Sequence, residues 1–361
     1  MNLLKITKRD NLNRKNEIII RTLAIVLSIV CAGIILIIFG LNPLEIFKAI
    51  FEGAIGTDLR IKQTIIKAIP LIITSLGILV AFKMKFWNIG GEGQIVMGAM
   101  AATFVALNFS SLPKPVLLFA MAAAAMITGG FWAFVPAIFK ARMGTNETIF
   151  TLMMNYIAIK FVTYLQYGPW MDPNANGFPR VVPFGVNAVL PSLFGVHIGW
   201  VIALICIVAV YFLMKYTKLG YEITVVGESI ETARYAGMNI NRVIVVAMLI
   251  SGGLCGLVGM IQASAIEKTL VAGISAGYGF TAIITAWLAR LNAITTFFVC
   301  VAFAMLIQGG AYIQLAMNVP SAVSSIVQGT ILFFVLGSEF FIQYKVSLTR
   351  KTGKQTSKEV A

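Results

Sequence analysis

The sequence predicts an all-α membrane protein that crosses the bilayer about ten times. Of its 361 residues, 59% are apolar and only 12% are charged, and the mean hydropathy is +0.89. Soluble globular proteins are about 45–50% apolar and about 25% charged, so this apolar surplus cannot be buried inside one or two soluble domains. The composition excludes nucleic-acid binding, a cytosolic enzyme and a secreted disulfide scaffold as the primary function.

Apolar runs of membrane-spanning length support this class. A helix needs roughly 20 mostly apolar residues to cross about 30 Å of hydrocarbon. The stretch 277–311 is too long for one ordinary span, and Arg290-Leu291-Asn292 interrupt it, so it counts as two. The ten predicted spans are 18–39, 66–82, 88–107, 116–138, 148–166, 198–214, 243–262, 277–289, 293–311 and 322–337.

The first of these runs could be mistaken for a secretory signal, because basic residues from Lys5 to Arg21 precede it. It is long enough to span, however, and no small-residue cleavage site follows it, so we expect an uncleaved transmembrane helix. The cysteines also lie inside apolar runs and form no CxxC pair, which predicts packing residues and no metal site. They are Cys31, Cys206, Cys255 and Cys300.

The basic residues predict the orientation. With the N-terminus inside, 20 of the 28 Lys and Arg residues lie in cytoplasmic stretches and seven lie outside. Cytoplasmic loops of membrane proteins collect Lys and Arg, so we expect both termini to be cytoplasmic and the number of spans to be even. The predicted organisation is a basic N-terminus (1–17), a transmembrane domain (18–340) and a basic tail (341–361). The domain includes a long external loop (167–197) and a long cytoplasmic loop (215–242).

The sequence lacks the motifs that would bind ATP phosphates or a catalytic zinc ion. There is no GxxxxGK[ST] and no HExxH, and the one histidine, His197, lies at a predicted membrane edge. We therefore expect no catalytic residues, no metal and no bound cofactor, and no ATP site in this chain. Charged residues within the spans are also too sparse to favour a proton-coupled carrier.

The segment Asn88-Ile-Gly-Gly-Glu-Gly-Gln94 is the first polar motif of interest. Its three glycines permit a bend or close helix packing. Asn88, Glu92 and Gln94 then enter the membrane region, where an ionisable group is expensive and suggests function. Two interpretations of Glu92 stay open: a role along a solute pathway, or a carboxylate near a helix N-terminus, where the dipole favours it.

A second polar motif is Gly144-Thr-Asn-Glu-Thr-Ile149, which leads to Asn155 in the next span. Asn146 can cap a helix, and Glu147 suits its first turn. Asn155 lies about two turns deeper and needs a hydrogen-bond partner there. That partner is either a neighbouring helix or a polar cavity.

The cytoplasmic loop carries its own helical segment at 228–236, with Gly237 placed to end it. A helix this short is not stable alone. It either lies on the bilayer or docks on a partner.

Four segments together resemble one family: NIGGEGQ (88–94), GTNETIFTLMMNYIA (144–158), ETARYAGM (231–238) and GYGFTAIITAWLA (277–289). They are similar to the permease subunits of ABC importers of the branched-chain amino acid and simple-sugar superfamily, in its nucleoside-importer branch. The resemblance covers about residues 66–340. One departure is Trp287-Leu288-Ala289-Arg290, where the family often has a Leu-Gly pair, and this puts the local packing in doubt.

The resemblance implies a type II-like permease in the bacterial cell membrane that forms a heterodimeric pore with a second, related permease. ATP would be bound only by a cytoplasmic ABC ATPase, and an external lipoprotein would deliver a small neutral solute, a nucleoside. Asn88, Glu92, Gln94, Asn146, Glu147 and Asn155 would border the pathway. The ATPase-coupling helix would comprise Glu228, Ser229, Glu231, Ala233, Arg234, Tyr235 and Gly237.

Two alternatives remain at this point. The same machine could carry a simple sugar or a branched-chain amino acid, or the chain could be a stand-alone secondary transporter driven by an ion gradient. The coupling-type loop argues against the second alternative.

Overall fold

The computed structural model describes residues 4–8, 14–175, 177 and 179–348, and these residues are mostly helical. The chain divides into two compact units. The first comprises Met1–Phe47 with Met317–Ala361, and the second comprises Lys48–Ala316. The second unit contains the polar motifs singled out above.

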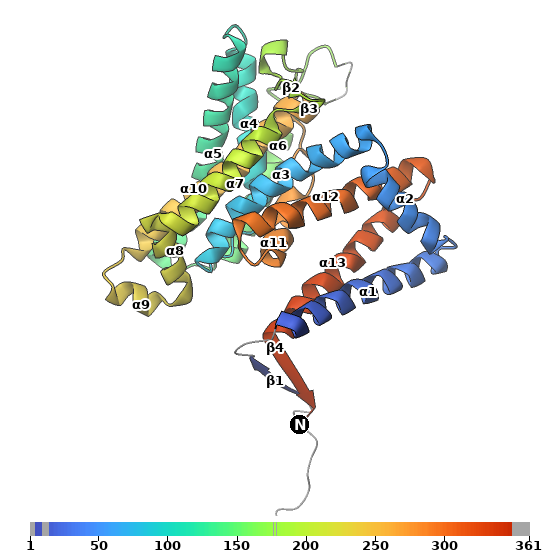
Figure 1. Ribbon diagram of the computed structural model, residues 1–361. Coiled ribbons are helices and arrows are strands. Elements are labelled where there is room, and N and C mark those ends of the chain that lie inside the picture. The colour runs from blue at the N-terminus through green and yellow to red at the C-terminus, as the bar shows by residue number, and fades with distance from the viewer. Residues whose placement is uncertain (1–3, 9–13, 176, 178, 349–361) are drawn as a thin grey trace, which may run out of the picture. The chain divides into compact units, whose positions relative to one another are not determined.

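In the first unit, α1 (Arg14–Ile38) packs against α13 (Ser321–Gln343), as Figure 1 shows. Arg21 near the start of α1 donates to Glu339 near the end of α13 at 3.1 Å, so the two helices run antiparallel. The strands β1 (Leu4–Lys8) and β4 (Tyr344–Leu348) pair antiparallel beyond the helices. Both strands fall in the predicted basic terminal segments, of which 1–3, 9–13 and 349–361 lie outside the described residues.

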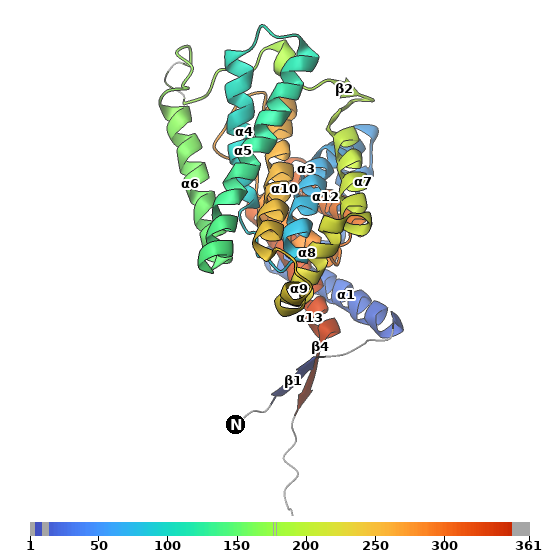
Figure 2. The same ribbon diagram turned by 90° about the vertical axis from the view of Figure 1, so that its left-hand side faces the viewer.

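The second unit is organised around two buried helices, α3 (Asp58–Lys83) and α10 (Ile240–Ile261). Figure 2 shows α10 beside α4 and α5, with α6 at the edge of the unit. The outer helices in this unit are long and apolar, whereas the connecting ones are short. Its other helices are the C-terminal part of α2 (Pro43–Ile55), α4 (Gly91–Asn108), α5 (Lys114–Met143), α6 (Glu147–Tyr167), α7 (Gly199–Tyr216), α8 (Lys218–Glu228), α9 (Ile230–Tyr235), the π-helix η2 (Gln262–Glu267), α11 (Tyr278–Leu288) and α12 (Ala293–Ala316).

A helix occupies each predicted span, but only eight helices of the described chain are long and apolar enough to cross a membrane. The other two predicted spans correspond to α4 and α11. The first turn of α4 is the polar Gly91-Glu92-Gly93-Gln94 sequence, and α11 has 11 residues, or about 16 Å. The predicted count of ten spans is therefore not confirmed.

The predicted interruption of the 277–311 stretch is confirmed. Helix α11 ends at Leu288 and α12 begins at Ala293. Between them, Arg290 and Leu291 have φ values of +54° and +52°. This left-handed backbone reverses the chain in a tight turn.

Glycines let α10 cross α4 and α5 at backbone contact. A Cβ built on Gly256 would lie 2.1 Å from the carbonyl oxygen of Ala125 in α5, and one on Gly98 of α4 would lie 2.3 Å from the Gly256 oxygen. Membrane helices associate through such small residues because lipid supplies no hydrophobic force between them. This crossing fixes the position of α4 and hence of the polar motif at its start.

The predicted external loop contains η1 (Val186–Ala188) and a short hairpin of β2 (Ser192–Leu193) and β3 (Val196–His197), which leads into α7. His197 is buried, and its Nδ1 accepts a hydrogen bond from the Gly199 N–H at 3.2 Å. Within the described chain its Nε2 has no hydrogen-bond partner. Burial lowers the pKa of His197 from 6.5 to about 4, so the folded hairpin holds a neutral ring.

This burial predicts an acid-sensitive hairpin. Because the folded pKa is lower than the unfolded one, unfolding takes up a proton, and stability is lost as the pH falls from 6.5 towards 4. The loss is at most about 1.4 kcal/mol per pH unit. We expect thermal unfolding of the wild type to show a larger decrease over this range than that of His197→Asn, which retains an acceptor for Gly199 but does not titrate. Parallel curves for the two proteins would contradict this account.

Candidate functional site

The start of α4 is held by a network of buried amides. Asn88 donates from Nδ2 to the Ser251 hydroxyl of α10 at 3.0 Å and to Oε1 of Gln94 at 3.3 Å. In return, Nε2 of Gln94 and the N–H of Gly90 each donate to Oδ1 of Asn88 at 3.0 Å. The loop before α4 is therefore folded back and fixed by its own side chains.

Asn155 supplies the second support for this loop, from α6. Its Oδ1 accepts from the Gly93 N–H at 2.8 Å, and its Nδ2 donates to the Ile89 carbonyl at 2.9 Å. Gly93 allows this contact, since a Cβ there would lie 2.9 Å from Asn155. The partner that the sequence required for Asn155 is thus the backbone at the start of α4.

Glu92 is nearly buried, with 5% of its surface exposed, and it contacts a different helix. Its two carboxylate oxygens accept from the N–H groups of Gly277 at 3.0 Å and Gly279 at 2.8 Å, at the N-terminus of α11. A Cβ on Gly279 would lie 2.3 Å from the Glu92 nitrogen, so only glycine permits this approach. Of the two interpretations left open, this geometry favours a helix-capping carboxylate, and the capped helix is α11 rather than its own α4.

The remaining two predicted pathway residues lie apart from this cluster, at the start of α6. Asn146 is exposed and caps that helix, accepting from the N–H groups of Thr148 and Ile149. Glu147 pairs with Lys140 of α5 at 2.8 Å. The structure therefore brings together Asn88, Gln94 and Asn155 with the start of α4, and places Asn146 and Glu147 at the end of α6 predicted to be cytoplasmic.

Aromatic stacking holds the other end of α11. Trp287 stacks on Trp87 with ring centroids 5.5 Å apart, and Phe82 at the end of α3 contacts both rings. Trp287 therefore has defined partners, which answers the doubt raised by its departure from the family pattern. The Trp87–Trp287 pair was not predicted, because the two residues are 200 positions apart.

The segment predicted as one coupling helix, 228–236, is two elements. Glu228 is the last residue of α8, and Ser229 caps α9 by accepting from the Thr232 N–H at 3.2 Å. The break arises because the extended backbone of Ser229, with φ −154° and ψ 117°, ends one helix and starts the next. The predicted end at Gly237 is confirmed, since this residue has φ +72° after the last turn.

Most of α9 faces outward. Tyr235 is 96% exposed, and Glu231 and Arg234 form an exposed ion pair at 3.5 Å. Ala233, in contrast, is completely buried, so it supports the loop and is not part of a docking surface. Beside α9, residues of α8 and of the start of α10 line a groove of about 580 Å³ that includes Tyr221, Glu222, Gly237, Met238 and Arg242.

Comparison with known proteins places the chain in a family. Residues 60–336 match the family described as "Branched-chain amino acid transport system / permease component". The chain belongs to this family. It is therefore an ABC transporter permease and a multi-pass protein of the cell membrane, and members of this kind transport rather than catalyse. Permeases of ABC transporters act together with ATPase and substrate-binding subunits, so membership of this family implies such partners. It also argues against the alternative that this chain is a stand-alone secondary transporter.

Three related permeases align with most of this chain. The glucose ABC transporter permease protein TsgB13 of Haloferax volcanii is 33% identical over 90% of this chain and 89% of its own. The nucleoside ABC transporter permease protein NupB of Lactococcus lactis subsp. cremoris is 29% identical, covering 90% and 92%. The guanosine ABC transporter permease protein NupP of Bacillus subtilis is 30% identical, covering 94% and 99%.

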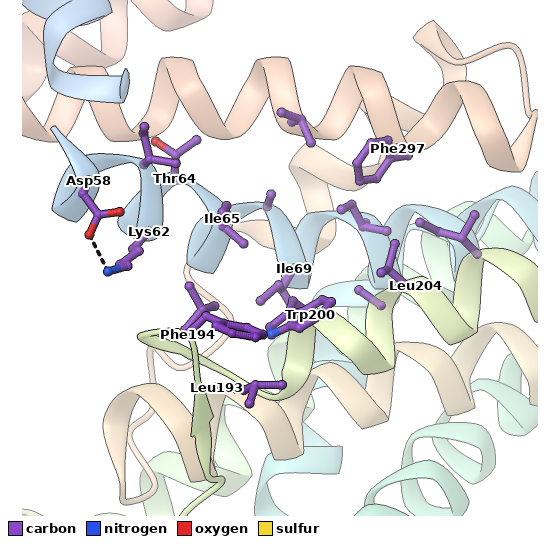
Figure 3. A pocket seen from close by; sticks show the side chains of 17 residues that line it. Asp58, Lys62, Thr64, Ile65, Ile69, Leu193, Phe194, Trp200, Leu204 and Phe297 are labelled. Atoms are coloured by element: carbon purple, nitrogen blue, oxygen red, sulfur yellow. Dashed lines mark hydrogen bonds and ion pairs between the residues drawn. The ribbon is translucent and has the colours of Figure 1, made fainter. Parts of the chain in front are cut away.

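A second groove of the permease, of about 480 Å³, lies between α3, α7, α12 and the β2–β3 hairpin. Figure 3 shows its lining, in which Ile65, Ile69, Trp200 and Phe297 are typical, while the Asp58–Lys62 ion pair lies at one end. A polar solute in this groove would lose its hydrogen bonds to water without replacement. This groove therefore does not suit a polar cargo.

Proposed function

We propose that this permease is one of two related membrane subunits of an ABC importer for nucleosides. A second, homologous permease completes the pore, a cytoplasmic ATPase drives it, and an external substrate-binding lipoprotein delivers the cargo. The observation that carries the proposal is the similarity, over at least 90% of this chain, to two permeases named for nucleoside and guanosine transport.

The electrostatics of the polar cluster support an uncharged cargo. Half-helix N-termini near the bilayer centre commonly bind anionic groups of a substrate. Here the N-terminus of α11 is already occupied by Glu92, and the start of α4 by Asn155. Because the N–H groups of Gly277, Gly279 and Gly93 have internal acceptors, these three donors are not available to a substrate carboxylate. This favours a nucleoside or a sugar over a branched-chain amino acid.

The second candidate cargo is a simple sugar. It is favoured by the 33% identity to a glucose permease. Glucose and nucleosides are both neutral and rich in hydroxyl groups, so the electrostatic argument does not separate them.

Competition for uptake separates these cargoes. Cells that express the permease with its partner subunits would take up labelled nucleoside while unlabelled adenosine, guanosine, uridine, glucose, ribose and leucine are added in turn. We expect competition by the nucleosides only. Competition by glucose or ribose alone would retain the importer and replace its cargo, and competition by leucine would contradict the electrostatic argument.

We further propose that the polar cluster positions the pathway rather than lining it, since Asn88, Glu92, Gln94 and Asn155 are buried and hydrogen-bonded within the chain. The ATPase would contact the exposed face of α9 and the groove between α8 and α10. Gly227 lets α8 pack directly against the end of α3, because a Cβ on Gly227 would lie 2.0 Å from the carbonyl oxygen of Lys83. Movement of the loop would therefore be passed directly to α3.

Tyr235→Ala tests this coupling surface. Tyr235 is almost fully exposed, so its removal should leave unfolding unchanged within about 0.5 kcal/mol. If the ring is an anchor at the ATPase interface, we expect a loss of more than about 2 kcal/mol of binding energy, and uptake to fall at least about tenfold. Tyr216→Ala is the matched control, because Tyr216 is also an exposed tyrosine but lies at the end of α7. Equal uptake by the two variants would contradict the assignment of α9.

A further inference from the structure

The free face of α6 carries aromatic hydroxyls and a lysine. Its members recur at spacings of three and four residues, which places them on one side of the helix. The opposite side, with Thr151 and Asn155, is buried against the start of α4. The exposed side chains Met153, Tyr156, Lys160, Tyr164 and Tyr167 follow one another along this face, and we call them the α6 stripe. Ile149 and Ile157 are exposed on the same face, and Phe161 is exposed at its edge.

Two other helices of the same unit expose a different chemistry. Between residues 116 and 139 of α5 and between 204 and 212 of α7, all exposed side chains are apolar, as expected for contact with lipid. Examples are Phe119 and Ile127 on α5 and Val208 on α7, which is 67% exposed. On the α6 stripe, Tyr156 and Tyr164 are 58% and 63% exposed. The contrast indicates that the stripe faces a more polar environment than lipid.

Lys160 strengthens this conclusion. It lies 13 residues after Glu147 and seven before Tyr167, or about 20 Å and 10 Å along a helix whose length matches the hydrocarbon core. Its Cβ leans towards the helix N-terminus, away from the nearer end. None of the ion pairs formed among the described residues includes Lys160. An ammonium group at this depth is costly in lipid and calls for water or a polar partner.

We propose that the α6 stripe lines a water-filled route through the assembled importer and contacts the cargo. Tyrosine rings stack on planar bases, and each stacked base contributes about 1–3 kcal/mol. The Lys160 ammonium donates to a carbonyl oxygen of the base and repels cations. The stripe thus suits an uncharged heterocycle with carbonyl acceptors, and this choice of cargo rests on the proposed function.

Cysteine labelling in cells that express the whole importer tests the stripe. The variants are Lys160→Cys, Tyr164→Cys and, as a lipid-facing control, Val208→Cys. The probe is a membrane-impermeant anionic methanethiosulfonate, which the Lys160 ammonium does not repel, and the parent chain with its four cysteines gives the blank. A thiol reacts as the thiolate, which forms in water and not in lipid, so we expect positions 160 and 164 to label at least about tenfold faster than 208.

Addition of guanosine or uridine, whose bases carry carbonyl groups, should then slow labelling at 160 and 164 several-fold. Equal rates at 160 and 208 would overturn the water-filled route, whatever the cargo. Labelling that no solute slows would overturn the contact with cargo. Protection by glucose but not by nucleosides would leave the route standing and overturn the proposed nucleoside function.

Discussion

Gly256→Ala should abolish the folded permease, although it adds one methyl group. The new Cβ would lie 2.1 Å from the Ala125 carbonyl oxygen and 3.0 Å from the Gly129 Cα, both backbone atoms of α5. No side-chain rotation relieves such a contact, so α10 and α5 must separate and lose packing along the crossing. We expect a destabilisation of about 3 kcal/mol or more. The measurement is the yield of monodisperse protein in detergent and its thermal unfolding.

Gly253→Ala is the matched control for this substitution. Gly253 lies one turn earlier on the same helix, but its nearest neighbour, the Met126 oxygen, would be 3.4 Å from a new Cβ. Both substitutions gain up to about 1 kcal/mol of helix propensity. We therefore expect Gly253→Ala to be neutral or slightly stabilising. Similar stability of the two variants would show that close approach at Gly256 is not what joins these helices.

Glu92→Gln should have the second largest effect. The side chain keeps its shape. In the wild type, the carboxylate accepts hydrogen bonds from the N–H groups of Gly277 and Gly279, but in the variant the amide nitrogen would face one of these two donors. One buried donor is left without an acceptor, and the charged hydrogen bonds to the N-terminus of α11 are lost. We expect a destabilisation of about 2–4 kcal/mol, with a matching loss of uptake. Thermal unfolding and uptake per folded protein measure the two effects.

Glu52→Gln controls for the loss of one negative charge. Glu52 is half exposed and pairs with Lys48 at 3.7 Å on the surface, so its replacement should cost less than about 1 kcal/mol. If Glu92→Gln unfolds and transports like this control, the carboxylate does not hold α11.

Local features of the sequence were sufficient to predict where most helices lie and where several of them end. Hydropathy identified a helix at each apolar run, the Arg290–Asn292 interruption marked the turn between α11 and α12, and Gly237 marked the end of α9. These predictions succeed because each depends on residues within a few positions along the chain. The predicted count of ten spans was not confirmed, although both α4 and α11 are apolar by composition. Helix α4 is polar in its first turn, and α11 is too short to cross a membrane.

The tertiary structure decided the role of each buried polar side chain. Glu92 meets Gly277 from 185 positions away, Asn155 meets Gly93 from 62, and Asn88 meets Ser251 from 163. The sequence could indicate that such groups need partners, because burial without a hydrogen bond is costly. It could not identify those partners, since they depend on which helices pack together. The glycine crossing of α10 with α4 and α5 determines part of that packing, and with it the position of the start of α4.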